Sequence, residues 1–396
     1  MDSCYTCRKD LFRKGDFVRF LHTADWHIGK KLHGYDLLED QAHIIEQILT
    51  IAKTEKVDAI VIAGDLYDRS IPSEEGVRLL NQTIAEINLT AGIPLLAISG
   101  NHDSATRLAT GAPWFAQSNF HLHTRLDQAF KPIVMGNTAF FLLPYFEPVD
   151  ARIHFEDSSI RSIHDAMPIV IEKIKKQFDP KYKQVLVSHF FVSGSSRTDS
   201  ETKVEVGGLD GINGVLLEDF TYVALGHLHN KNALNLPNAR YSGSPLKYSL
   251  SEKEQKKGVW LVETESQLNL KFIELEPLRE MQELQGTFEY FLTPDTYQQL
   301  NRENYFSFLL EDRSIIPNMM NQLRKVYPKV LQVGRLNGRE NSQQSAIKKL
   351  KEKTPIELTE EFFTSIVQVA PTERQKKWIE QTIHQLVKNG GESDAS

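Results

Sequence analysis

Cysteine is scarce in this sequence. The 396 residues include two cysteines, Cys4 and Cys7. Two cysteines cannot form a disulfide framework, and two thiolates are too few to close a structural zinc site. A redox or metal motif at this pair stays an alternative, although no second pair or adjacent histidine completes it. We therefore expect a protein of a reducing cytoplasm.

Long apolar segments and phosphate-binding loops are also absent from the sequence. No run of about 18 apolar residues occurs, which is the length that a membrane-spanning helix needs. The N-terminal residues lack the apolar core of a signal peptide, so we expect a soluble protein that is not exported. Because no Gly-x-x-x-x-Gly-Lys-Ser/Thr stretch occurs, any ATP dependence must reside in another subunit.

An excess of positive charge is missing as well. The formal net charge is -6, with 25% charged and 40% hydrophobic residues. This composition is typical of a globular chain with two or three domains. It argues against a uniformly basic surface for nucleic acid, so contact with a polyanion would rely on local basic loops and bound metal.

The sequence does contain a series of five short polar motifs. They are, in order, Asp25-Trp-His27, Gly64-Asp65-Leu-Tyr-Asp68, Gly100-Asn101-His102-Asp103, Ser188-His189 and Gly226-His227-Leu-His229. Any one of them alone is more often a polar loop than a site. Together they offer oxygen and imidazole donors without a thiolate, which suit two divalent cations that polarise a phosphate and activate water. The sequence thus predicts phosphoester hydrolysis at a two-metal centre.

An apolar run precedes each motif, as in an α/β domain whose strands carry ligands at their carboxyl ends. We predict strands at 18–23, 59–63, 94–99, 184–188 and 222–225, and helices at 38–54 and 74–87. The helices show amphipathic spacing and should cover the sheet. Gly64, Gly100 and Gly226 stand just before ligand positions, where we expect them to adopt left-handed backbone dihedrals.

A different pattern begins near residue 276. We predict strands at 286–292, 305–310 and 330–333 and a helix at 317–326, which together would form a small cap. Residues 334–344 are polar and rich in glycine and asparagine, which indicates a flexible linker. Two amphipathic helices, broken near residues 370–371, are predicted within 355–386. Residues 1–17 precede the first credible strand, and we interpret them as a leader or a wrongly assigned start.

The five motifs, taken together over residues 18–275, resemble the calcineurin-like metallophosphoesterase superfamily. Within it, the stretches 21–29, 64–69, 100–104 and 241–245 resemble the SbcD family, the nuclease subunits of bacterial SbcCD complexes. The resemblance implies an α/β fold: a four-layer metallophosphoesterase β-sandwich flanked by helices, plus a small α+β capping domain and C-terminal helices. Together with the sequence pattern, it divides the chain into a leader or wrongly assigned start at 1–17, a nuclease domain at 18–275, a capping domain at 276–345, partner-docking helices at 346–390 and a tail at 391–396.

The resemblance also assigns ligands to two cations, with manganese as the expected ion. One cation would be held by Asp25, His27, Asp65 and His229. The second would be held by Asp65, Asn101, His189 and His227, so that one aspartate bridges the pair.

Three neighbouring residues are expected to have other roles. By resemblance, His102 would steady the transition-state charge and pass a proton to the leaving oxygen, and the carboxylate of Asp68 would orient that imidazole. The alternative for Asp68 is a cap on the turn before Arg69. Asp103 is expected to stabilise the loop through hydrogen bonds to its own backbone, a structural role.

The function expected from the resemblance is metal-dependent hydrolysis of DNA phosphodiester bonds. It comprises 3′-to-5′ double-strand exonuclease and single-strand and hairpin endonuclease activity in DNA replication, recombination and repair. Contacts to DNA phosphates are expected at Lys30, Lys31, His33 and Arg69, although an exposed basic loop is as often only solvated surface. The alternatives are a small-molecule or cyclic-nucleotide phosphodiesterase and a metal-free scaffold of the same fold.

The expected partner is an SbcC-type ABC ATPase, which would bind ATP in place of this chain and gate access of DNA to the nuclease. Its coiled coil would dock on an apolar surface made of Phe362, Phe363, Ile366, Val367, Trp378, Ile379 and Ile383. Alternatively, these residues pack onto the cap. We expect a homodimer within a heterotetramer, cytoplasmic and nucleoid-associated, without membrane attachment.

Overall fold

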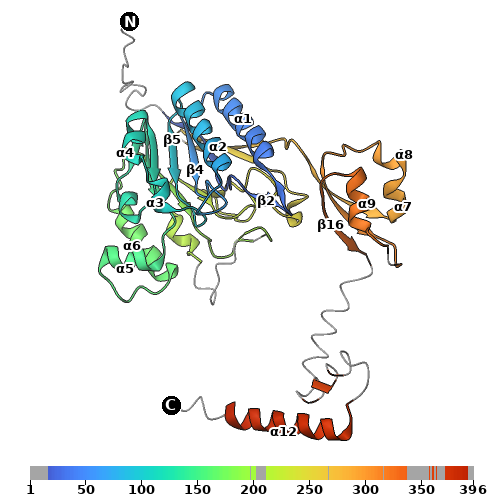
Figure 1. The fold of residues 1–396 in the computed structure, drawn as a ribbon. Helices are drawn as coiled ribbons and strands as arrows, with labels where there is room; N and C mark the ends of the chain where they lie inside the picture. The colour runs from blue at the N-terminus through green and yellow to red at the C-terminus, as the bar shows by residue number, and fades with distance from the viewer. Residues whose placement is uncertain are drawn as a thin grey trace. The chain divides into compact units, whose positions relative to one another are not determined.

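The structure is a computed structural model (Figure 1). It describes residues 17–196, 198–201, 211–265, 267–314, 316–336, 356, 359–360, 363 and 371–390. The chain divides into two compact units. The first unit contains residues up to 283 together with 301–307 and 327–332, and the second contains the remainder. The boundaries expected for the capping domain and the C-terminal helices stay predictions, and the expected leader falls almost entirely outside the described residues.

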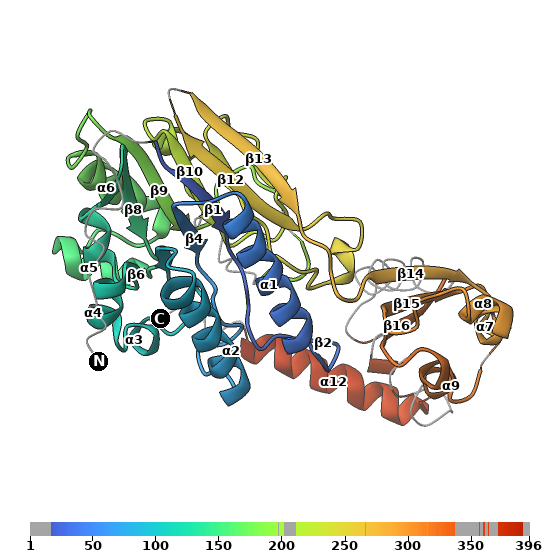
Figure 2. The same ribbon diagram turned by 90° about the horizontal axis from the view of Figure 1, so that it is seen from above.

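Two sheets form the centre of the first unit (Figures 1 and 2). The larger sheet has the order β13-β12-β1-β4-β5-β6, formed by Leu268–Glu274, Gly258–Thr264, Arg19–Thr23, Ala59–Ala63, Leu95–Ile98 and Phe120–His123. The smaller sheet has the order β11-β10-β9-β8-β7, formed by Ala239–Tyr241, Tyr222–Gly226, Lys183–His189, Thr138–Leu143 and Ile133–Met135. Strands β1, β4, β5 and β6 run parallel, as do β8 to β11. The carboxyl ends of each parallel set therefore meet at one edge.

The two sheets pack face to face through a buried apolar layer. Phe20 and Val61 from the larger sheet meet Phe140, Val187 and Tyr222 from the smaller one, and all five are fully buried. Strand β4 has only apolar residues and is buried throughout, because both of its faces are covered. The five strands predicted before the motifs are confirmed, each within one residue at either end.

Helices cover the outer faces of both sheets. On the larger sheet, α1 (Leu38–Thr54) and α2 (Glu74–Ile84) share a core with β1 and β4. On the smaller sheet, α5 (Pro148–Phe155) and α6 (Ile163–Lys175) share a core with β8 and β9. The resulting order of helix, sheet, sheet and helix confirms the predicted four-layer α/β sandwich (Figure 2). The short helices α3 and α4 are Ala105–Leu108 and Ala112–Phe115, and the hairpin strands β2 and β3 are Lys31–Leu32 and Tyr35–Asp36.

The helix predicted at 38–54 is confirmed with the same bounds. The one predicted at 74–87 is an α-helix only to Ile84, after which Ala85–Thr90 forms a π-helical turn. Among the described residues, no helix is both long enough and apolar enough to cross a membrane.

Past residue 276 the described residues form a third sheet, three short helices and one long helix. The sheet has the order β14-β15-β16, formed by Met281–Gly286, Tyr305–Leu310 and Val330–Arg335. The helices are α7 (Phe288–Leu292), α8 (Pro294–Tyr297), α9 (Met319–Val326) and α12 (Glu373–Gly390).

Two predictions in this region are wrong. Residues 286–292 were predicted as a strand, but the hydroxyl of Thr287 accepts a hydrogen bond from the backbone N–H of Tyr290 and begins helix α7 instead. Residues 334 and 335 were predicted as linker, but they complete β16. Residues 337–355 lie outside the described part of the chain.

The predicted partner-docking surface is described only at three side chains. Trp378 is exposed, Phe363 is half-buried and Ile379 is buried. The other four side chains predicted for it lie outside the described residues.

Candidate metal centre

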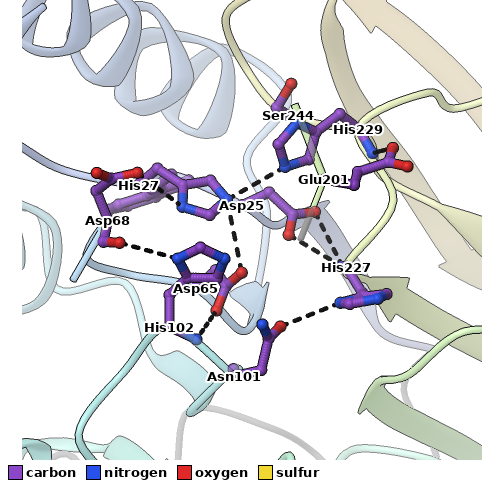
Figure 3. A network of polar contacts seen from close by, with 12 residues as sticks. Asp25, His27, Asp65, Asp68, Asn101, His102, Glu201, His227, His229 and Ser244 are labelled. Atoms are coloured by element: carbon purple, nitrogen blue, oxygen red, sulfur yellow. Dashed lines mark hydrogen bonds and ion pairs between the residues drawn. The ribbon is translucent and has the colours of Figure 1, made fainter. Parts of the chain in front are cut away.

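All seven predicted ligands lie together at the carboxyl edge of the two sheets, and Figure 3 labels all of them except His189. The larger sheet contributes Asp25 and His27 after β1, Asp65 after β4 and Asn101 after β5. The smaller sheet contributes His189 at the end of β9, and His227 and His229 after β10. The structure therefore brings together residues from five distant stretches of sequence, as the strand pattern predicted.

One group of donors surrounds His27. Its Nε2 lies 3.2 Å from Nε2 of His229 and 3.5 Å from Oδ2 of Asp65. Ligand atoms of Asp25, His27 and His229 lie within 4.8 Å of one another. These are the residues that the resemblance assigns to the first cation.

A second group lies on the other side of Asp65. Its Oδ2 is 3.3 Å from Nε2 of His189. The Oδ1 of Asn101 is 3.0 Å from that same nitrogen and 3.1 Å from Nδ1 of His227. Because Oδ2 of Asp65 faces an imidazole of each group, this carboxylate is placed where a bridging ligand would stand.

The backbone is strained at the ligands themselves. Asp25, His27, Asp65 and His227 all have positive φ, at 54, 44, 51 and 96 degrees. Each such non-glycine residue costs on the order of 1–3 kcal/mol and persists only where the surrounding structure imposes it. Clusters of this kind are typical of functional sites.

The three motif glycines serve two different purposes. Gly64 has φ +90, as predicted. The prediction was wrong for Gly100 and Gly226, whose φ values are not left-handed. They are needed for close packing, because a Cβ at Gly100 would collide with the carboxylate of Asp65, and one at Gly226 with the carbonyl oxygen of Ala63.

Burial and neighbouring charges shift the pKa values of the acids and imidazoles in the centre. Burial, only partly offset by His189 and His229 and reinforced by the charge of Asp65, raises the pKa of Asp25 to about 7. Burial opposes protonation of His189, but the charge and hydrogen bond of Asp65 outweigh it and raise the pKa of His189 to about 9. The centre therefore holds protons among its donors unless other positive charge is supplied. Buried carboxylate, amide and imidazole donors of this kind fit a pair of divalent cations.

Backbone groups hold several of the donors in place. Nδ1 of His189 donates to the carbonyl oxygen of Ala63 at 2.7 Å, which directs Nε2 toward the centre. The backbone N–H of His227 donates to the Asp25 carboxylate at 3.0 and 3.2 Å. Asp103 accepts from the backbone N–H of Gly100 in its own loop, as predicted, and also from the N–H groups of residues 66 and 67 in the preceding motif.

His102 stands beside both groups. Its backbone N–H donates to Oδ1 of Asp65 at 2.9 Å, and its ring lies edge-on to that of His27 with centroids 4.8 Å apart. Its Nδ1 bonds to Asp68 at 2.9 Å, but to the backbone carbonyl oxygen rather than the carboxylate (Figure 3). The predicted pairing through the carboxylate is thus corrected: the main chain orients this imidazole.

The carboxylate of Asp68 instead accepts a hydrogen bond from Nζ of Lys30 at 2.7 Å. The ammonium of Lys30 is thus paired inside the protein, which argues against its predicted contact with DNA. Lys31, His33 and Arg69 are exposed, as their predicted contacts require.

Several residues that support the centre carry no signal in the sequence. They include Gln41, Ser200, Glu201, Tyr248 and Glu252. Gln41, for example, donates from Nε2 to the carbonyl oxygen of His27 at 2.7 Å from within helix α1. These contacts link the motif residues to residues far away in the sequence. No local motif therefore marks them.

Comparison with known proteins gives the following matches. Residues 18–231 match the family model described as calcineurin-like phosphoesterase, and residues 277–366 match one described as the Type 5 capsule protein repressor C-terminal domain. A protein of Staphylococcus saprophyticus, named as the SbcD component of the SbcCD nuclease, is 35% identical over 94% of this chain and 100% of its own length. A protein of the same name from Staphylococcus epidermidis is 36% identical over 86% of this chain and 92% of its own length. Among solved structures, a dimetal phosphatase from Danio rerio is 13% identical with a TM-score of 0.41, covering 66% of this chain and 97% of that chain.

Proposed function

The chain belongs to the calcineurin-like phosphoesterases and, within them, to the SbcD family, and we propose that it cleaves DNA as the nuclease subunit of an SbcCD-type complex. It is a metal-dependent phosphodiesterase by family. The observation that supports the proposal is the convergence of the seven donors around Asp65. The proposed substrate is a DNA phosphodiester, and the proposed ion is manganese.

The proposed ligand sets follow the two groups of donors. One cation would be held by Asp25, His27, Asp65 and His229, and the other by Asp65, Asn101, His189 and His227. When bound, such a pair polarises the scissile phosphate and makes water a nucleophile at neutral pH. The protein then needs no covalent nucleophile of its own.

His102 is the proposed proton donor to the leaving oxygen. Because a carbonyl oxygen only accepts hydrogen bonds, Nδ1 of His102 must carry a proton to bond with Asp68. Nε2 is then the nitrogen that takes up and releases the catalytic proton. The main-chain hydrogen bonds at both ends of this residue fix the ring relative to Asp65.

The experiment compares wild type and His102→Gln on a blunt, end-labelled DNA duplex with Mn²⁺. We expect a loss of about 100- to 10000-fold in rate, the usual contribution of a general acid, with Mn²⁺ binding retained. His164→Gln, an exposed histidine on α6, is the matched control and should cut at the wild-type rate. Equal cleavage by His102→Gln and wild type would contradict the assignment.

Two alternatives are tested in the same assay. A small-molecule phosphodiesterase would cleave bis(p-nitrophenyl) phosphate or a cyclic nucleotide but leave the duplex intact. A metal-free scaffold would cleave neither and would not bind Mn²⁺. The complete set of seven donors argues against the scaffold.

The finer activities and the partner are proposed on the family alone. They are 3′-to-5′ polarity, hairpin opening, and assembly of a homodimer with an SbcC-type ATPase that binds the ATP. End-labelling at each terminus tests the polarity. Light scattering of the chain with and without the ATPase tests the assembly.

A further inference from the structure

His189 and His229 differ in the group that holds their Nδ1 atom. His189 bonds through Nδ1 to a backbone carbonyl oxygen, that of Ala63. His229 bonds through Nδ1 to a side chain, the hydroxyl of Ser200, at 2.6 Å. A carbonyl oxygen can only accept, so it fixes a tautomer by itself, but a hydroxyl can donate or accept. Something must therefore decide which role Ser200 takes.

That role is decided by Glu252. The hydroxyl of Ser200 also bonds to Oε1 of Glu252, which is fully buried. On the other carboxylate oxygen, Nζ of Lys257 donates at 2.5 Å, and this lysine is also buried. The buried ammonium keeps Glu252 ionised, since an unpaired charge in the interior is costly. An ionised carboxylate has no proton to donate, so Ser200 must give its single proton to Glu252.

Ser200 is then left with only lone pairs for His229. Nδ1 of His229 must carry the proton that makes the 2.6 Å bond, so in the neutral ring the lone pair lies on Nε2. That Nε2 is the atom lying 3.2 Å from Nε2 of His27, within the first donor group. Lys257 and Glu201 also hold the main chain of His229, through its carbonyl oxygen at 2.8 Å and its N–H at 2.7 Å (Figure 3 shows Glu201 beside His229).

We propose that Glu252, acting through Ser200, is a positioning residue that fixes the tautomer of His229 so that Nε2 presents its lone pair to the first cation. The effect on cation binding rests on the proposed two-cation function. The tautomer of His229 itself does not require a bound metal. Neither residue touches the reacting atoms. Outer carboxylates that orient a metal-binding imidazole typically change metal affinity by about 10- to 100-fold when removed.

The test uses the full chain and two readouts. Nitrogen chemical shifts of ¹⁵N-labelled histidine in the metal-free protein report which ring nitrogen of His229 carries the proton. Titration with Mn²⁺ followed by electron paramagnetic resonance reports affinity. Ser200→Ala should lose the Nδ1–H tautomer and weaken Mn²⁺ binding by about 10- to 100-fold. Ser200→Thr restores the hydroxyl and should recover both, whereas Ser196→Ala, an exposed serine of the same segment, should change neither.

A second variant guards against a simple folding defect. Glu252→Gln/Lys257→Met removes the buried ion pair as a unit, so no single charge is left unpaired. It should reproduce the loss of the His229 tautomer seen in Ser200→Ala. A proton on Nε2 in the wild type, or wild-type affinity and tautomer in Ser200→Ala, would overturn the proposal. If the wild type binds no Mn²⁺, the two-cation function fails. The nitrogen chemical shifts would still show whether Ser200 and Glu252 fix the tautomer of His229.

Discussion

The two sheets bring different chemistry to the metal centre. The larger sheet delivers every oxygen donor, namely Asp25, Asp65 and Asn101, and one imidazole, while the smaller sheet delivers imidazoles only. Neither sheet alone holds the full set of ligands proposed for either cation. The centre therefore exists only after the sheets have packed.

Short contacts across this seam show how closely the sheets must approach. The N–H of His227 reaches Asp25, and Nδ1 of His189 reaches the carbonyl oxygen of Ala63. Deeper in the seam, His22 of β1 bonds to the hydroxyl of Tyr222 at 2.9 Å. Changes at the seam should thus affect both the fold and the cations, in proportion to how far they disturb this approach.

The largest effect is expected where one residue serves both sheets. Asp65→Asn keeps the size of the side chain but removes the charge shared by the two donor groups. We expect this change to remove several kcal/mol of transition-state stabilisation, which would lower the cleavage rate by about 1000-fold. DNA cleavage and Mn²⁺ stoichiometry are the measurements, with Asp127→Asn on the surface as the control. If Asp65→Asn still binds two ions tightly, the two donor groups do not share this carboxylate.

The next effect is expected from forcing the sheets apart. A methyl group at Gly226 would meet the main chain of β4, which cannot move as a flexible side chain does. We expect Gly226→Ala to lower the free energy of unfolding by about 3 kcal/mol or more. Gly92→Ala is the control, because its Cβ meets no atom within 4 Å and only its φ of +69 opposes the change, at a cost of about 1–2 kcal/mol. Equal losses in urea denaturation would show that the seam tolerates the methyl group.

Sequence reasoning recovered the elements that follow a local pattern. Strand β4 and helix α1 match their predicted bounds, because continuous apolar runs and amphipathic spacing are local signals. Strands β12 and β13 were not predicted; β13, at the edge of the larger sheet, has only half-buried and exposed residues, which give a weaker pattern. The fold class and the seven ligands came from the motifs and the resemblance they carry.

Details that depend on close approach were not predictable. The sequence places Gly226 before a ligand but does not show that β4 passes next to it. The orienting group for His102 is a main-chain carbonyl oxygen, and main-chain atoms leave no mark in a sequence. Likewise, Ser200 and Glu252 reach His229 from 29 and 23 residues away, a separation that only the folded chain closes.

A smaller and pH-dependent effect is expected at His22. Burial, only partly offset by the hydrogen bond to Leu225, lowers the pKa of His22 from 6.5 to about 3. Below pH 6.5 the unfolded chain therefore takes up a proton that the folded chain refuses until about pH 3. Stability from this group is fully present above pH 6.5 and falls as the pH falls, by about 2 kcal/mol near pH 5. His22→Gln does not titrate, so its unfolding free energy should fall less between pH 7 and 5; parallel curves would mean that His22 takes up its proton in the folded state.

The smallest effect is expected from the basic residues beside the centre, and it extends the comparison to DNA. Lys31 and Arg69 both follow strands of the larger sheet. They would therefore contact a DNA phosphate on the side of the centre that supplies the oxygen ligands. Because such contacts release counterions, Arg69→Ala and Lys31→Ala should each lower the slope of log affinity against log salt by about 1, whatever the DNA sequence. Fluorescence anisotropy with the His102→Gln protein measures binding without cleavage. The control is Lys271→Ala. Lys271 is exposed, and its partner Glu55 lies at the edge of the sheet opposite the ligands, so this change should leave the slope unchanged. An equal change of slope in the control would mean that DNA is not held at the ligand edge of the larger sheet.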